Sequence, residues 1–162
     1  MTDLDWPYNL PIWQRSLHLK SPDGTMWADI KDAIEVSMGN PTLGTLVLSN
    51  GLEVEKCNPS FVWSDDSKFL AVAQYTSNWF GGSGKQKLLI LNVLENNAWR
   101  SPKLAYYIQP ESFKDGVVTV TISPFHKPQA RQFSLESIKQ NFEFIKTLPN
   151  KALQSGRPAA GG

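Results

Sequence analysis

The chain has 162 residues, about the length of one domain, and its 41% hydrophobic and 19% charged residues are typical of a globular protein. Its 16 Lys and Arg residues balance 15 Asp and Glu residues, and the net charge of +1 argues against a nucleic-acid partner and against an anionic membrane. One cysteine and two histidines exclude an internal disulfide and a multi-cysteine zinc site, and we expect no metal and no cofactor.

The N-terminal region predicts a cytoplasmic protein. Its first residues are acidic, and no apolar run of the length found in signal peptides follows them. The longest apolar stretch, 88–91, is far shorter than the ~20 residues of a membrane helix. Residues 1–15 are rich in Trp, Pro and Tyr and predict an extended arm that packs its aromatic side chains on the domain or exposes them for recognition.

Residues 16–121 alternate apolar and polar side chains in short runs separated by turn residues, as antiparallel strands do. The run 16–20 precedes a Ser-Pro-Asp-Gly turn. The next run, 26–38, exceeds a typical strand and predicts a bulge near Asp32 and Ala33. The dipeptide Asn50-Gly51 predicts the tight turn of a hairpin.

The same pattern then occurs again. A short apolar strand, 61–63, leads to the turn 64–67 and to a longer strand, 68–75. A glycine-rich loop is followed by the strand 87–93, and another segment starts near Trp99.

These two units have Ser-x-Asp turns that are 43 residues apart, at Ser21 and Ser64. The strings LHLKSPDGTMWADI (17–30) and FVWSDDSKFLAVAQ (61–74) resemble the blade signature of TolB-type and WD-repeat β-propellers. The resemblance covers residues 17–99 and implies blade-like antiparallel meanders.

A closed propeller needs at least about four blades, and the third possible turn, at Ser123, lacks the Asp-Gly pair. We therefore predict a mainly β fold in which two antiparallel meander sheets pack as a sandwich or form one bent sheet.

After two further strand-like runs, 103–109 and 116–123, the period changes to that of a helix. Apolar residues at spacings of three and four predict a C-terminal amphipathic helix over 134–148. Ser134 is its expected N-cap and Pro149 ends it. We expect a single β-rich domain over 1–150 and a disordered tail over 151–162. The apolar stripe of the helix consists of Leu135, Ile138, Phe142, Ile145 and Leu148.

The glycine-rich segment at 81–85 is not predicted to bind phosphate as a P-loop does. Trp79 and Gln86 occupy the positions where that motif needs a glycine and a Ser or Thr, and a strand follows where a helix is required.

No catalytic constellation stands out, and we predict that the protein is not an enzyme. Cys57, with His18 or His126 as its base, lacks the sequence signature of a catalytic thiol, and we expect it to be buried. The acidic pairs Asp65-Asp66 and Asp29/Asp32 could serve acid–base chemistry or calcium binding, but we expect them to cap turns.

The loop before the strand 87–93 is the predicted binding site. It places large aromatic side chains beside adaptable glycines, as protein interfaces often do. The predicted binding residues are Trp79, Phe80, Gly81, Gly82 and Lys85.

We therefore predict a non-catalytic protein-binding module, for example a small cytosolic inhibitor or an immunity-type protein, whose partner is another protein. One alternative is a carbohydrate-binding module that uses Trp79, Trp99 or Trp6. The other is an enzyme with a site that the sequence does not reveal.

Overall fold

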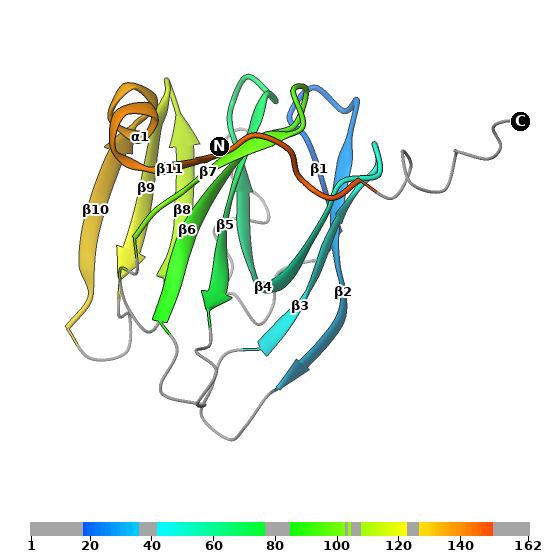
Figure 1. Ribbon diagram of the computed structural model, residues 1–162, viewed down its shortest axis with the longest axis horizontal. Coiled ribbons are helices and arrows are strands. Elements are labelled where there is room, and N and C mark those ends of the chain that lie inside the picture. Colours follow the sequence, from blue (N-terminus) through cyan, green and yellow to red (C-terminus); the bar gives the residue numbers. More distant parts are fainter. Residues whose placement is uncertain are drawn as a thin grey trace, which may run out of the picture.

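Two antiparallel sheets and one short helix make up the computed structural model, which describes residues 18–35, 42–76, 85–102, 104, 108–122 and 127–150. An eight-stranded sheet has the order β1-β2-β3-β4-β5-β6-β7-β11, and a three-stranded sheet has the order β10-β9-β8 (Figure 1). The elements are β1 His18–Lys20, β2 Trp27–Glu35, β3 Thr42–Leu48, β4 Glu53–Trp63, β5 Phe69–Thr76, β6 Lys85–Asn92, β7 Asn97–Arg100, β8 Ile108–Lys114, β9 Val117–Ile122, β10 Gln129–Ser134, α1 Leu135–Asn141 and β11 Glu143–Ile145. The predicted mainly β class with a C-terminal helix is confirmed.

The two repeat units lie side by side in one bent sheet (Figure 1). The long strand β4 joins them, because its first half pairs with β3 and its second half with β5. Of the two predicted arrangements for the units, the bent sheet is therefore the one found. The small sheet of β8, β9 and β10 forms a second layer, which packs against the large sheet through β8.

Both faces of the large sheet are apolar, which explains the unbroken apolar runs in β5 and β6. One face packs against the small sheet and α1. The opposite face carries a separate apolar core, and we call it the inner face. The core between the sheets includes Val62, Ala71, Leu88, Ile90, Phe113, Val118, Val120 and Ile138. The core of the inner face includes Ala28, Leu46, Val54, Cys57, Trp63, Val72, Leu89 and Leu148.

The two Ser-x-Asp turns have the same hydrogen bonds. In the first, the Ser21 hydroxyl donates to Asp23 (2.8 Å) and accepts from the Met26 N–H (3.1 Å). In the second, the Ser64 hydroxyl donates to Asp66 (2.6 Å) and accepts from the Phe69 N–H (2.9 Å). This equivalence supports an internal repeat at the level of local structure.

The predicted bulge and hairpin are both present. The register of β2 against β3 shifts between Lys31 and Ile34, at the expected place. Between β3 and β4, Gly51 has φ +95°, which a residue with a side chain rarely adopts.

The C-terminal helix begins as predicted but ends early. The Ser134 hydroxyl accepts from the Ser137 N–H (3.1 Å), which confirms the N-cap, but α1 ends at Asn141 and not at residue 148. Phe142 is its C-cap, and Glu143–Ile145 pairs with β7 as β11. Residues 142–148, which the sequence predicts as the last two turns of the helix, therefore contribute an edge strand to the large sheet and the segment after it.

Some predicted elements fall outside the described residues: the arm 1–15, the tail 151–162 and most of the run 103–109. The sequence pattern does not predict strand β10, because its sequence, QARQFS, is mostly polar. All its side chains except that of Phe133 are exposed. Its pairing with β9 defines it instead.

Candidate functional site

Residues 146–150, which we call the strap, cross the inner face of the large sheet (Figure 1). The Leu148 N–H donates to the Asn96 carbonyl (3.0 Å) in the β6–β7 turn. The Pro149 carbonyl accepts from the Glu53 N–H (3.1 Å) at the start of β4. The strap therefore connects two strand ends that are far apart in the order of the sheet.

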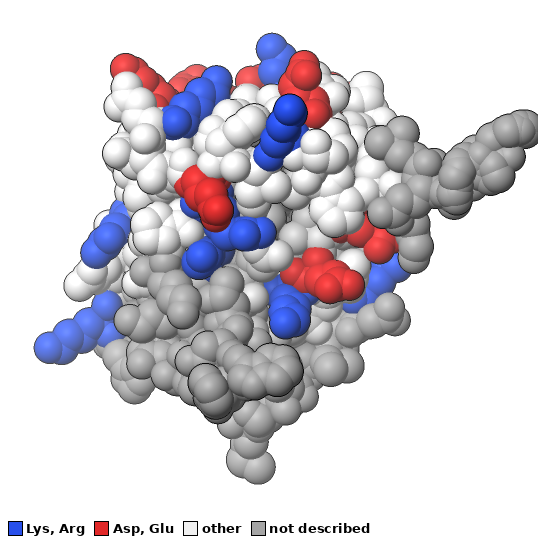
Figure 2. Space-filling view, viewed as in Figure 1, with Lys and Arg blue, Asp and Glu red and all other residues white. Residues whose placement is uncertain are grey.

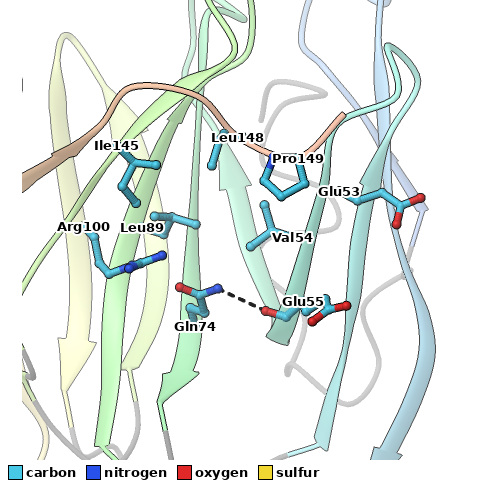
Figure 3. Close-up of a pocket in the computed structure, with 9 residues that line it drawn as sticks. All are labelled: Glu53, Val54, Glu55, Gln74, Leu89, Arg100, Ile145, Leu148 and Pro149. Carbon is cyan, nitrogen blue, oxygen red and sulfur yellow. Dashed lines mark hydrogen bonds between the residues drawn. The ribbon is translucent and has the colours of Figure 1, made fainter. Parts of the chain in front are cut away.

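Beneath the strap lies a pocket of about 350 Å³. Ile145, Leu148 and Pro149 form its upper wall, and side chains of β4, β5, β6 and β7 form the rest (Figure 3). Its size is at the lower end of the ~300–1,000 Å³ typical of ligand pockets. The lining residues are Glu53, Val54, Glu55, Gln74, Leu89, Arg100, Ile145, Leu148 and Pro149.

Two polar side chains point into the pocket. The Gln74 amide nitrogen donates to the Glu55 carbonyl (3.1 Å), which holds its oxygen on the side of Arg100 (Figure 3). The Arg100 guanidinium reaches in from β7, and its Nε is buried without a hydrogen-bond partner among the described residues. A buried N–H without a partner is costly. Because this atom is closed to solvent, an occupant of the pocket would meet the exposed part of the guanidinium instead.

The rim of the pocket carries acidic side chains. Glu143, directly opposite Arg100 in the β11–β7 pair, has its Oε1 3.9 Å from Arg100 Nη1. The carboxylates of Glu53 and Glu55 point away from Arg100 (Figure 3). Positive and negative side chains are interspersed over the face seen in Figure 2, which shows no single large patch of either sign.

The structure does not test the predicted binding residues. Trp79, Phe80, Gly81 and Gly82 lie outside the described residues, and of Lys85 only its backbone position, as the first residue of β6, is described. The loop that contains them starts three residues after Gln74 along the chain.

The structure places the candidate catalytic groups in separate surroundings. Cys57 is fully buried in the inner-face core, its thiol donates to the Val54 carbonyl (3.5 Å), and burial raises its pKa to about 12. His18 contacts Asp29 across the β1–β2 pair at the edge of the sheet. His126, the second histidine considered as a base, is outside the described residues.

The expectation that the acidic pairs cap turns is wrong for Asp29 and Asp32, which lie within the strand β2. Asp66 caps its own turn, whereas Asp65 bonds the distant turn between β8 and β9. Asp66 accepts from the Lys68 N–H (3.0 Å), and Asp65 accepts from the Asp115 N–H (3.1 Å). In the first turn, the Thr25 N–H and hydroxyl, with the Ser21 hydroxyl, lower the pKa of Asp23 to about 2. Among the residues that the structure describes, no group of three or more His, Cys, Asp or Glu is placed to hold a metal ion.

The described part of the chain contains no helix that is long and apolar enough to cross a membrane. No protein-family model, curated protein or solved structure matches this chain.

Sequence reasoning missed the pocket. Its lining residues are spread from position 53 to position 149, and strand pairing and the strap bring them together. Arg100 follows Trp99 in an unremarkable strand, so no local pattern indicates its place in a pocket.

Proposed function

We propose that the protein is a non-catalytic protein-binding module, a class that includes small inhibitors and immunity-type proteins, and that it binds its partner at the pocket beneath the strap. The pocket is the observation that carries this proposal. It combines an apolar interior with a charged rim.

Apolar anchors surrounded by polar groups are the usual anatomy of a protein interface. Val54, Leu89 and Leu148 supply the apolar walls, while Glu53, Glu55 and Glu143 lie at or near the rim. The walls formed by β4 to β7 belong to interior strands of the sheet, so on that side a partner segment would meet a preformed surface with little ordering cost. The predicted binding loop, with Trp79, lies outside the described residues, and only the sequence places it near Gln74.

A matched pair of variants tests the proposal. Ile145 lines the pocket, and the neighbouring Phe144 is on the opposite side of the same strand, 52% exposed and against Trp99. Ile145→Trp places an indole ring in part of the pocket, whereas Phe144→Trp places the same indole ring outside it.

The experiment selects peptides from a random displayed library on the wild-type protein. We expect the enriched peptides to share a motif, to bind Phe144→Trp normally and to lose binding to Ile145→Trp, with both variants folded by thermal melting. Undiminished binding to Ile145→Trp, or no enrichment of a shared motif, refutes the pocket as a protein-binding site.

A further inference from the structure

Arg100 is held in the pocket with hydrogen-bonding capacity that the surrounding residues do not use. Its strand, β7, lies between β6 and β11, and its backbone pairs with Leu89 and Glu143. Its side chain is 31% exposed, yet its Nε is buried and has no hydrogen-bond partner in the part of the chain that the structure describes. Guanidinium has five N–H donors, and its two Nη groups can together present a planar pair of N–H bonds to the two oxygens of a carboxylate.

The one carboxylate paired with Arg100 in the described residues is a weak competitor. The closest approach to Glu143 is 3.9 Å, beyond the roughly 2.7–3.2 Å of a hydrogen bond. The Glu143 side chain is 67% exposed, so water screens this interaction. The carboxylates of Glu53 and Glu55 point away, so among the described residues that line the pocket none pairs its carboxylate with Arg100 (Figure 3).

The groups next to Arg100 define what else an occupant would need. The Gln74 side-chain nitrogen donates a hydrogen bond to the Glu55 carbonyl, which leaves the Gln74 oxygen able to accept a peptide N–H. Leu89, Ile145 and Leu148 offer an apolar surface on the same side of the pocket (Figure 3). An occupant that uses all three features combines a carboxylate, a peptide N–H and an apolar side chain.

Resting on the proposed function, we propose that the pocket binds an Asp or Glu side chain of the partner protein next to an apolar residue. The carboxylate pairs with the Arg100 guanidinium, and the apolar side chain packs against Leu89, Ile145 and Leu148. A chain-terminal carboxylate fits less well, because such groups are usually captured by successive backbone N–H groups. Here the lining strands β4 to β7 are interior to the sheet and pair on both sides.

The test uses three small probes observed by NMR at the Arg100 Nε–H resonance. The first is the acetylated and amidated dipeptide aspartyl-leucine, and the second is its asparaginyl-leucine analogue, which removes the charge and keeps the shape. The third is acetyl-leucyl-leucine with a free carboxyl terminus. We expect the aspartyl probe to shift the Nε–H resonance and to bind about tenfold or more tightly than the asparaginyl probe.

Four variants show whether this preference depends on Arg100. Arg100→Gln should abolish the preference for the aspartyl probe, while Arg131→Gln, an exposed arginine on β10 of the other sheet, should leave it unchanged. Glu143→Gln removes the competing carboxylate and should tighten binding of the aspartyl probe. A purely structural role for Arg100 does not predict this gain. Arg100→Lys keeps the charge without the planar pair of donors, so it should retain a smaller preference for the aspartyl probe than the wild-type protein. If Arg100→Gln fails to fold, Arg100→Lys takes its place in the test.

Several results overturn the inference. These are equal binding of the aspartyl and asparaginyl probes, a preference that survives in folded Arg100→Gln, and no shift of the Nε–H resonance. Tighter binding of the free-carboxyl probe assigns the pocket to a chain terminus and refutes the side-chain assignment.

The inference and the proposed function can fail separately. Displayed peptides that need the pocket but not a carboxylate would refute only the inference. Charge-dependent dipeptide binding without any displayed peptide at the pocket would refute only the protein-binding function.

Discussion

Leu148 is the side chain through which the strap joins the core of the inner face. It is 4% exposed and packs into the inner-face core, and its backbone N–H and carbonyl are both bonded to Asn96 (3.0 and 3.2 Å). Leu148→Ala keeps these backbone bonds and removes only apolar contacts.

A buried Leu→Ala change costs about 2–5 kcal/mol, depending on the cavity that it leaves. Because Leu148 already borders the pocket, the removed atoms create less new enclosed space, and we expect a loss of about 2–3 kcal/mol. For a chain of this length that corresponds to a fall in Tm of roughly 4–12 °C.

The assay is urea unfolding followed by tryptophan fluorescence, together with a thermal melt. Leu94→Ala is the matched control, because this leucine in the β6–β7 turn is 67% exposed and its loss should change stability by about 0.5 kcal/mol or less. If Leu148→Ala is no more destabilising than Leu94→Ala, the strap is not part of the cooperatively folded core. A lower denaturant slope in the variant would show that the strap detaches before the sheet unfolds.

Two further predictions concern pH. Burial raises the pKa of Cys57 to about 12 in the folded protein, against an ordinary 9.0. The free energy of unfolding should therefore fall as pH rises from 9 to 12, and Cys57→Ala should not show this fall. The native thiol should resist dithionitrobenzoate at pH 8 and react fully in urea; rapid native labelling contradicts its burial. The pKa of Asp23, about 2 against an ordinary 3.8, stabilises the fold above pH 3.8, and this contribution is lost as pH falls towards 2. Asp23→Asn should therefore flatten the stability profile in that window, and an NMR titration that places the Asp23 pKa at 3.8 or higher would contradict the hydrogen bonding described.

The sequence predicted those parts of the fold that local chemistry determines. The Asn50-Gly51 turn, the Ser134 cap and the paired Ser-x-Asp turns each depend on side chains within a few residues of one another. The apolar runs of β5 and β6 were visible because both of their faces are buried.

The elements that the sequence did not reveal depend on distant pairing. Phe142, Ile145 and Leu148 have the spacing of a helix stripe, but Ile145 pairs with Ala98 in β7 and Leu148 is held by Asn96. The pocket follows from these same contacts, since without β11 and the strap it has no upper wall. Local periodicity does not report contacts between positions that are 50 to 100 residues apart.

The strap also bears on how the protein is made. The Asn150 side chain donates to the Asn50 carbonyl across 100 positions of sequence, and every strand from β1 to β7 precedes the strap in the chain. During synthesis from the N-terminus, the large sheet can therefore pair while the inner face under the strap is still uncovered. Contacts of such long sequence separation form slowly, because loop closure must come before the stabilising contacts. In the interval before the strap closes, the nascent chain therefore exposes the apolar inner face, a state in which chains are prone to aggregate and in which a chaperone would be useful.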